Sequence, residues 1–361
     1  FLQKRNIMTS IVAVDIRKLS KDQIIEAVVG MGEKKFRAKQ IYEWLWVKSA
    51  TSFDDMTNLS KSLREKLKAH FLIRPIESDI IQHSNDGTIK PRFKLHDGHL
   101  IEAVLIPVPH DNRFTVCVSS QVGCSLTCKF CATGQMKLRR NLDAGEIYDQ
   151  VVEVNKQSLE KFGLPLTNIV YMGMGEPLLA YRNVMESIEK ITSPEGLNMS
   201  PKRITVSTAG IAKMIKQLGD DDVKFNLALS LHAATDAKRS EIMPINDSNT
   251  LEALSEALIY FHEKTGSRVT FEYIIFKDFN DSLEDAKDLA AFAKIVPCKI
   301  NIIEYNTVDD VQFLKADPEK TDKFAAFLEN TFNLIVNVRR SRGKDIDAAC
   351  GQLANKNEAA K

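Results

Sequence analysis

Three cysteines lie close together in the segment Gly-Cys-Ser-Leu-Thr-Cys-Lys-Phe-Cys, which ends at Cys131. The C-x₃-C-x₂-C spacing of Cys124, Cys128 and Cys131 lets three thiolates of one loop bind three corners of an iron–sulfur cubane. The fourth iron then has no protein ligand. It can chelate the amino and carboxylate groups of S-adenosylmethionine (SAM), so that an electron from the cluster cleaves a carbon–sulfur bond. The spacing therefore predicts a [4Fe–4S] cluster together with SAM.

A structural zinc site is the alternative for these cysteines. Such a site usually has four ligands, and His110 and His232 are the nearer candidates for the fourth. Zinc does not explain the x₃–x₂ spacing, so the cluster is favoured. In a reducing compartment, clustered cysteines are typical of metal binding or catalysis and not of a disulfide framework. Cys298, inside an apolar run, is expected to belong to the core.

The composition is that of a soluble protein, and its 361 residues suffice for one large domain and an appendage. No apolar run approaches the roughly 20 residues that cross a bilayer, and residues 1–10 do not resemble a signal peptide, so we expect a cytoplasmic protein without a membrane partner. Met8 is the expected start, with 1–7 as upstream sequence. The net charge of +1 neither favours nor excludes nucleic acid.

From about residue 114 onward, apolar strand candidates alternate with amphipathic helical stretches. This alternation predicts an α/β fold with a parallel sheet and right-handed crossovers. Six or seven such units are too few for a closed eight-fold barrel, so we expect an open, partial (β/α) barrel. The candidate strands are 114–119, 168–172, 203–207, 224–231, 268–276, 299–304 and 333–338.

The part of the chain before this alternation has a different character. Three helices are predicted, beginning near Ser20, Phe36 and Ser60, and the first has a capping-box pattern, Ser20-Lys-Asp-Gln23. Turn signals at 85–87 and 96–98 then indicate an antiparallel meander that joins two domains. The predicted division is an N-terminal helical, RNA-binding type of domain (11–75), a β-meander linker (76–110), the partial barrel (111–345) and a C-terminal segment with Cys350 (346–361).

Small and polar residues recur where the predicted parallel strands end. Active groups gather at this edge in parallel (β/α) folds. Glu176, between Gly175 and Pro177, could pair with the amino group of SAM there, and the neighbouring glycines would allow close backbone approach. The other residues at these ends include Ser207, Thr208, Ser230, Leu231, His232, Glu272 and Asn306.

Three segments together resemble the RlmN/Cfr family of radical SAM enzymes, which are RNA adenine methyltransferases. They are Cys117-Val-Ser-Ser-Gln-Val-Gly-Cys124, Gly-Met-Gly-Glu176-Pro177 and Asp345-Ile-Asp-Ala-Ala-Cys350-Gly-Gln-Leu. The resemblance covers nearly the whole chain and implies a partial (β/α)6-type radical SAM barrel. One departure is Tyr305-Asn306-Thr307, which lacks the proline that often follows this asparagine in the family. The SAM contacts implied by the family are Gly175, Glu176, Ser207, Ser230, Leu231, His232 and Asn306.

The resemblance also implies a mechanism that uses two SAM molecules per turnover and an external one-electron reductant. One SAM methylates Cys350, and the second yields a radical that removes a hydrogen atom from this S-methyl group. The resulting carbon adds to adenine, and Cys117 releases the product by forming a disulfide with Cys350. Glu102 is the implied proton acceptor. Carbon 2 of adenine is electrophilic, so polar methyl transfer cannot work there and a covalent carrier is needed.

The implied product is 2-methyladenosine in 23S rRNA and in tRNA anticodon loops, formed by a monomeric enzyme. The segments 268–273 and 297–301 look more like this carbon-2 branch than like its alternative, Cfr-type methylation of carbon 8 in 23S rRNA. Two further alternatives are a non-catalytic RNA-binding protein with a structural metal and a radical SAM enzyme that acts on a protein or a small molecule.

Basic residues flank the predicted chemistry on both sides and are candidates for RNA phosphate contacts. A third basic group, in the N-terminal helices, also fits an ordinary amphipathic helix with a solvated charged face. The first two groups are Lys129, Lys137, Arg139 and Arg140, and Arg339, Arg340, Arg342 and Lys344; the third is Lys34, Lys35, Arg37 and Lys39 with Phe36, Tyr42, Trp44 and Trp46.

Overall fold

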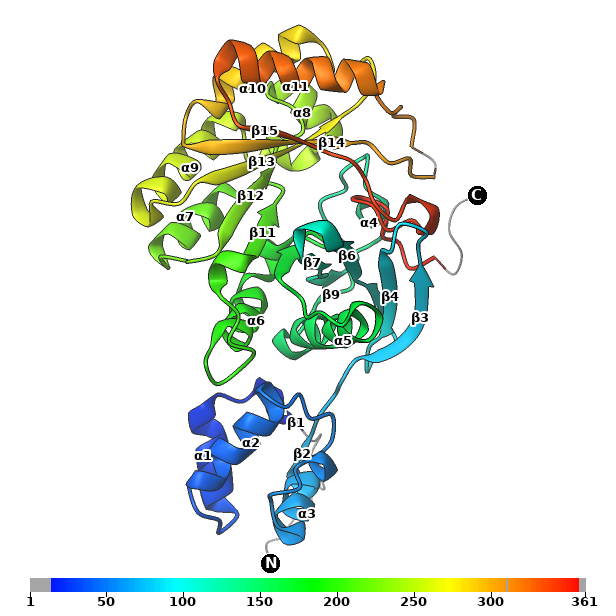
Figure 1. Ribbon diagram of the computed structural model, residues 1–361. Coiled ribbons are helices and arrows are strands. Elements are labelled where there is room, and N and C mark those ends of the chain that lie inside the picture. The colour runs from blue at the N-terminus through cyan, green and yellow to red at the C-terminus, as the bar shows by residue number, and fades with distance from the viewer. Residues whose placement is uncertain (1–13, 310, 357–361) are drawn as a thin grey trace, which may run out of the picture. The chain divides into compact units, whose positions relative to one another are not determined.

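The computed structural model describes residues 14–309 and 311–356 (Figure 1). Its described residues form two compact units, one of residues 14–75 with 193–198 and one of residues 76–192 with 199–356. The predicted start at Met8 and the outer ends of the predicted segments 11–75 and 346–361 lie outside the described residues.

The first unit contains the three predicted helices, α1 (Lys21–Gly30), α2 (Phe36–Trp46) and α3 (Lys61–His70). Two short strands, β1 (Val14–Asp15) and β2 (Phe71–Leu72), pair in parallel beside them. The predicted capping box is present, because the Ser20 hydroxyl accepts the Gln23 N–H and the Gln23 side chain accepts the Ser20 N–H. The apolar faces of the helices form the core of the unit, which includes Ile24, Val28, Ile41, Leu45, Trp46, Leu63 and Leu67.

The second unit is built on one large sheet in the order β15-β14-β13-β12-β11-β10-β7-β6-β4-β3, with β5 paired to β4. From β7 to β15 every neighbouring pair is parallel, and neither β15 nor β3 closes the sheet. The predicted partial barrel is therefore confirmed. Its parallel strands are β7 (Arg113–Cys117), β10 (Asn168–Tyr171), β11 (Ile204–Thr208), β12 (Asn226–Ser230), β13 (Val269–Ile275), β14 (Cys298–Glu304) and β15 (Val336–Arg339).

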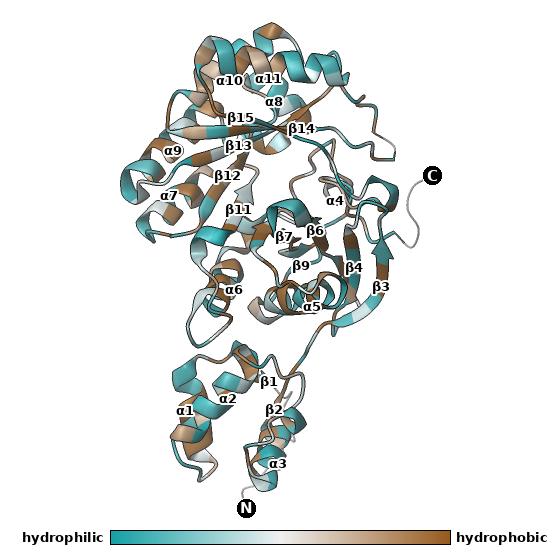
Figure 2. Cartoon of the chain, in the orientation of Figure 1, coloured by the Kyte–Doolittle hydropathy of each residue, from teal (hydrophilic) through white to brown (hydrophobic). Residues whose placement is uncertain are grey.

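Helices connect the successive parallel strands, and Figure 2 shows mixed hydrophobic and hydrophilic bands on them. Such two-sided helices pack one face on the sheet and expose the other. No helix in the described part of the chain is long and apolar enough to cross a bilayer. The helices of this unit are α4 (Ala132–Gln135), α5 (Ala144–Phe162), α6 (Tyr181–Thr192), α7 (Ala212–Asp220), α8 (Asp236–Ile242), α9 (Leu251–Thr265), α10 (Leu283–Ala293) and α11 (Pro318–Phe332).

The antiparallel strands continue the same sheet, whereas the sequence indicated a meander between two domains. Strand β6 pairs with β7 along its whole length, and β4 pairs with β3, β5 and β6. The backbone of a buried strand needs hydrogen-bond partners on both sides. Strand β10 supplies them on one side of β7, and β6 supplies them on the other. The strands are β3 (Glu77–His83), β4 (Ile89–Lys94), β5 (Leu100–Glu102) and β6 (Val104–Val108), and two short strands, β8 (Gln121–Val122) and β9 (Arg140–Asn141), pair separately.

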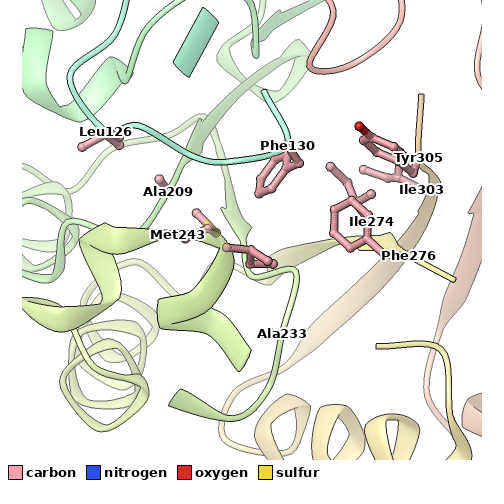
Figure 3. Close-up of a cluster of buried hydrophobic side chains, with 10 residues drawn as sticks. Leu126, Phe130, Ala209, Ala233, Met243, Ile274, Phe276, Ile303 and Tyr305 are labelled. Carbon is pink, nitrogen blue, oxygen red and sulfur yellow. The ribbon is translucent and has the colours of Figure 1, made fainter. Parts of the chain in front are cut away.

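A buried cluster of apolar side chains lies where the strands β11 to β14 end (Figure 3). Phe276, directly after β13, is its most connected ring, with centroid distances of 5.7 Å to Phe130, 5.0 Å to Tyr305 and 4.7 Å to Phe313. Phe130 belongs to the cysteine-rich loop, so this cluster holds that loop against the sheet.

We expect Phe276→Ala to lower the free energy of unfolding by about 3–5 kcal/mol, because it removes a fully buried ring from four aromatic neighbours. Leu283→Ala, at a position that is 55% exposed, should cost less than about 1 kcal/mol. Denaturant titration of both variants measures the difference. Equal losses of unfolding free energy in the two variants would show that the apolar cluster around Phe276 does not stabilise this edge of the sheet.

Candidate iron–sulfur and SAM site

The loop that carries the three clustered cysteines runs from the end of β8 to the start of α4. Gly123 opens it with a positive φ of 75°, and a Cβ there would lie 2.3 Å from the Lys137 carbonyl oxygen. Only glycine fits at this position. All three cysteines are half-buried and pack against the apolar cluster of Figure 3.

The three thiols lie close enough for their charges to interact. Burial raises the pKa of Cys124 to about 11 and raises the pKa values of Cys128 and Cys131 as well. The charges of Cys131 and Cys124 raise the pKa of Cys128 further. Three half-buried thiolates that repel one another would be stabilised by a cationic metal centre, so this donor set fits the iron–sulfur cluster.

Neither histidine of the zinc alternative forms a metal-binding group with these thiols in the described part of the chain. His232 is buried, and its Nδ1 accepts a 3.0 Å hydrogen bond from the Ile274 N–H, while burial and then the charge of Arg239 lower its pKa to about 3. His110 is largely exposed beside Asp111. Within residues 14–309 and 311–356, no three Cys, His, Asp or Glu side chains converge on a point that would hold one metal ion. A cubane has no such requirement, since each cysteine binds a different iron.

Glu176 is fully buried after β10, next to the cysteines. Its carboxylate accepts hydrogen bonds from the backbone of Leu178 (3.0 Å) and Ala209 (2.8 Å), and its charge raises the pKa values of Cys124 and Cys128. Burial raises the pKa of Glu176 itself, so a positive ligand group nearby would be favourable. The site therefore has a buried acid positioned beside the thiols.

Two glycines precede this acid, and both lie against a neighbouring segment of the protein, while the SAM contact of Gly175 stays a prediction. A Cβ on Gly175, where φ is 96°, would lie 2.4 Å from Gln121, and a Cβ on Gly173 would lie 2.7 Å from the Val118 carbonyl oxygen. The glycines thus admit a neighbouring segment of the protein. Gln121 uses this closeness to accept a 2.8 Å hydrogen bond from the Glu176 N–H.

The remaining predicted SAM contacts lie at the ends of neighbouring strands. The hydroxyls of Ser207 on β11 and Ser230 on β12 are 3.2 Å apart. Leu231 and His232 follow directly, and both donate their N–H groups to the Glu272 carbonyl oxygen of β13. Asn306 is buried two residues after β14, where its side chain donates to the Glu304 carbonyl oxygen over 3.3 Å.

The C-terminal segment packs against the cysteine loop and the sheet. The Gly351 carbonyl accepts a 2.7 Å hydrogen bond from the Ala132 N–H, and the Leu353 carbonyl accepts one of 2.6 Å from the Thr133 hydroxyl. On the other side, the N–H groups of residues 354 and 355 donate to the Glu102 carboxylate over 2.9 and 3.0 Å. Lys90 forms a buried ion pair with this carboxylate at 3.4 Å. Glu102 therefore anchors the segment that carries Cys350.

Cys350 and Cys117 are far apart in the sequence, but they lie near enough in the fold for the charge of Cys350 to act on Cys117. Cys117 is buried at the end of β7, and burial followed by the charge of Cys350 raises its pKa. Cys350 is open to solvent on one side, while the surrounding protein and the charge of Glu272 raise its pKa to about 11. All six cysteines are free thiols, so the expected Cys117–Cys350 disulfide is not present in this structure.

Three buried residues of the site had no recognisable signal in the sequence. Arg239, in a helix with a polar sequence, bonds to the backbone at the ends of β11 and β12. Gln121 and Lys90 hold Glu176 and Glu102 respectively. Each is recognisable only from contacts between distant parts of the chain.

The predicted basic groups are only partly free for a ligand. Lys129, Lys137 and Arg139 are exposed. Arg140, by contrast, holds both carboxylate oxygens of Glu146 at 2.7 and 2.8 Å and also contacts Asp97. On the other side of the site, Arg340 and Lys344 bind Glu304, at 2.8 and 3.0 Å, and Arg339 lies 3.9 Å from Glu272. In the N-terminal unit Tyr42 and Trp46 are core residues, whereas Phe36 and its neighbours Lys34 and Lys35 are exposed.

Comparisons with known proteins agree with this site. Residues 118–292 match the family model "Radical SAM superfamily", and residues 14–73 match "Ribosomal RNA large subunit methyltransferase N-terminal domain". The crystal structure of a radical SAM methyltransferase from Sphaerobacter thermophilus superposes with a TM-score of 0.89 at 39% identity, covering 95% of this chain and all of that one. The chain is thus a radical SAM methyltransferase, a class whose cofactors are a [4Fe–4S] cluster and SAM.

Proteins of similar sequence show which family of radical SAM methyltransferases this is. The chain is 57% identical over 356 residues to the probable dual-specificity RNA methyltransferase RlmN of Cytophaga hutchinsonii, covering 99% of this chain and 97% of the relative. It is 58% identical over 342 residues to the enzyme of the same name from Christiangramia forsetii, covering 95% and 96%. The chain belongs to the RlmN family.

Proposed function

We propose that this enzyme methylates carbon 2 of adenosine in 23S rRNA and in tRNA anticodon loops, with Cys350 as the methyl carrier. The observation that carries the proposal is the anchoring of the Cys350 segment near Cys117. Residues 354 and 355 donate hydrogen bonds to Glu102, and Val104, two residues after Glu102, pairs with Cys117 on β7. Both cysteines are free thiols. The names of the relatives, which describe dual-specificity RNA methyltransferases, support RNA as the substrate class.

We assign the cluster to Cys124, Cys128 and Cys131. When bound there, it supplies the electron, obtained from an external one-electron reductant, that cleaves SAM at a carbon–sulfur bond. Glu176 would accept hydrogen bonds from the amino group of SAM and would offset its positive charge in a buried place. The further SAM contacts would be Gly175, Ser207, Ser230, Leu231, His232 and Asn306.

Cys350 first takes a methyl group from one SAM: a carbon–sulfur bond to its Sγ forms, the bond to the SAM sulfonium breaks, and the thiol proton leaves. After losing one hydrogen atom to the 5′-deoxyadenosyl radical that the second SAM yields, this S-methyl carbon adds to carbon 2 of adenine. The adduct would then lose the C2 proton and one electron, which would return to the cluster. The Cys117 thiolate then attacks the Cys350 sulfur, and the bond between that sulfur and the transferred carbon breaks. The carbon takes up one proton to become the methyl group of the released base, and the remaining Cys117–Cys350 disulfide is reduced by an external reductant before the next turnover. Solvent access to Cys350 and the burial of Cys117 agree with these two roles.

Glu102 is proposed as the proton acceptor for the adenine C2 proton. Its carboxylate is fully buried, paired with Lys90 and bonded to the backbone of residues 354 and 355. These contacts mean that Glu102 also holds the segment of Cys350, and proton uptake would weaken that hold.

The target adenosine has to leave its stack, which favours an unpaired loop over a duplex. Lys129, Lys137 and Arg139 are exposed cations next to the cysteine loop and could bind the phosphates around a splayed-out nucleotide. We include Arg339 and Arg342 on the C-terminal side in the same RNA contact.

Replacing Cys117 with alanine should trap the covalent intermediate, because no thiol remains to attack the Cys350 sulfur. Denaturing gel electrophoresis after turnover should show an RNA–protein adduct that nuclease digestion removes. The matched variant Cys298→Ala, which changes a cysteine of β14 outside the site, should form no stable adduct and should release product. Free methylated RNA from Cys117→Ala at the wild-type rate would rule out this role of Cys117.

A further inference from the structure

Arg239 on α8 is a fully buried guanidinium whose hydrogen-bond partners are all neutral. Its Nε donates to the Leu231 carbonyl over 3.2 Å, and one terminal nitrogen donates to the Asn246 side chain over 2.8 Å. The other terminal nitrogen donates to the carbonyl oxygens of Ala209 and Ser230. Most N–H groups of the guanidinium thus have hydrogen-bond partners, but none of these partners carries a negative charge that would balance its positive charge.

No carboxylate in residues 14–309 and 311–356 forms an ion pair with Arg239. Asp236 lies three residues before Arg239 in the same helix, and its Oδ1 accepts hydrogen bonds from the Asn246 side chain at 2.8 Å and from the Leu251 N–H at 2.9 Å. Burial lowers the pKa of Arg239 to about 10, and the charge of Cys128 counteracts this more than that of Asp236 does. A buried cation without a partner is strongly unfavourable, so its counter-charge should be sought among the cysteines.

The helix that carries Arg239 is hydrogen-bonded to the cysteine loop. The Lys129 N–H donates to the carbonyl of Ile242, which ends the helix of Arg239, over 3.0 Å. The three cysteines pack against the apolar cluster of Figure 3, whose members include Ala209, Ile242 and Met243, and Ala209 is also a hydrogen-bond partner of Arg239. The cysteine loop and the Arg239 guanidinium therefore both contact this apolar cluster.

We infer that Arg239 is the fixed counter-charge of the iron–sulfur cluster and that it raises the reduction potential of this cluster. The inference rests on the proposed binding of the cluster by Cys124, Cys128 and Cys131. A [4Fe–4S] centre with three thiolates has a net negative charge, and one-electron reduction adds another. A cation held nearby in a medium of low dielectric constant stabilises the reduced form more than the oxidised one.

The same guanidinium is a positioning residue for SAM. It binds the carbonyl oxygens of Ser230 and Leu231, two proposed SAM contacts, and that of Ala209, whose N–H holds Glu176. Lysine keeps the charge but lacks the planar fork that joins these carbonyls. The two roles can therefore be separated by two substitutions.

The test is a redox titration of the reconstituted full-length chain, followed by electron paramagnetic resonance without SAM, after iron and sulfide analysis. R239Q should retain the cluster with a midpoint potential more negative than that of the wild type. R239K should keep the wild-type midpoint and bind SAM about tenfold more weakly, since it loses charge-assisted hydrogen bonds. R203Q, which removes an exposed arginine just before β11, is the matched control and should leave the midpoint unchanged.

A midpoint in R239Q equal to that in R203Q would overturn the inference. If R239Q does not retain the cluster, R239K decides: a wild-type midpoint with weaker SAM binding supports the inference, and a shifted midpoint overturns it. A wild-type protein that binds no cluster through Cys124, Cys128 and Cys131 would instead refute the cluster site itself.

Discussion

Replacing Cys350 with alanine is expected to abolish methylated adenosine while the enzyme still cleaves SAM. The cluster cysteines and Glu176 do not depend on this thiol, so 5′-deoxyadenosine should still form. The substrate carbon, however, comes from the S-methyl group of Cys350 in the proposed mechanism, and without the carrier no carbon reaches the base. Nucleoside mass spectrometry of the RNA and chromatography of the small molecules measure the two outcomes together.

Cys298→Ala is the matched control for this loss. Cys298 is a half-buried residue of β14 whose thiol donates to the Ala293 carbonyl over 3.2 Å, away from the proposed chemistry. It should retain product formation. A Cys350→Ala enzyme that still methylates RNA would refute the carrier role and would favour direct transfer by another route.

Replacing Cys128 with serine should remove both SAM cleavage and methylation, because the cluster loses one of three protein ligands. The wild-type chain should contain roughly four irons with sulfide after reconstitution, and the variant far fewer. Iron and sulfide analysis with anaerobic measurement of 5′-deoxyadenosine checks this. Cys117→Ala, a substitution of a buried cysteine outside the loop, should retain the wild-type iron content.

The metal analysis also separates the cluster from its alternative. One zinc per chain, with no iron bound by the wild type under anaerobic reconstitution, would contradict the cluster assignment. It would favour a structural metal in an RNA-binding protein.

The parallel strands could be predicted because most are largely buried apolar runs between helices with two-sided patterns, as β13 is along its whole length. Helix α1 shows the same for helix ends: the predicted capping box of Ser20 and Gln23 is present, and the helix begins at Lys21, where that pattern places it. Sequence separation does not affect such local signals. The cysteine spacing was equally local, since the three proposed ligands belong to one short loop.

Contacts between distant segments could not be predicted in this way. Arg140 was expected to contact RNA because it lies in a basic run, but Glu146 and Asp97 hold it. Arg239 lies in a sequence typical of a solvated helix, Asp-Ala-Lys-Arg-Ser-Glu, yet it is fully buried. The hydrogen bonds from residues 354 and 355 to Glu102 likewise join positions that are 252 and 253 residues apart, so no local pattern predicts them.

The most direct test of the proposed function is anaerobic incubation of the reconstituted enzyme with SAM, a reductant and unmodified 23S rRNA, followed by nucleoside mass spectrometry. We predict 2-methyladenosine. Detection of 8-methyladenosine instead would contradict the carbon-2 assignment, and formation of 5′-deoxyadenosine without any methylated adenosine would contradict the RNA substrate.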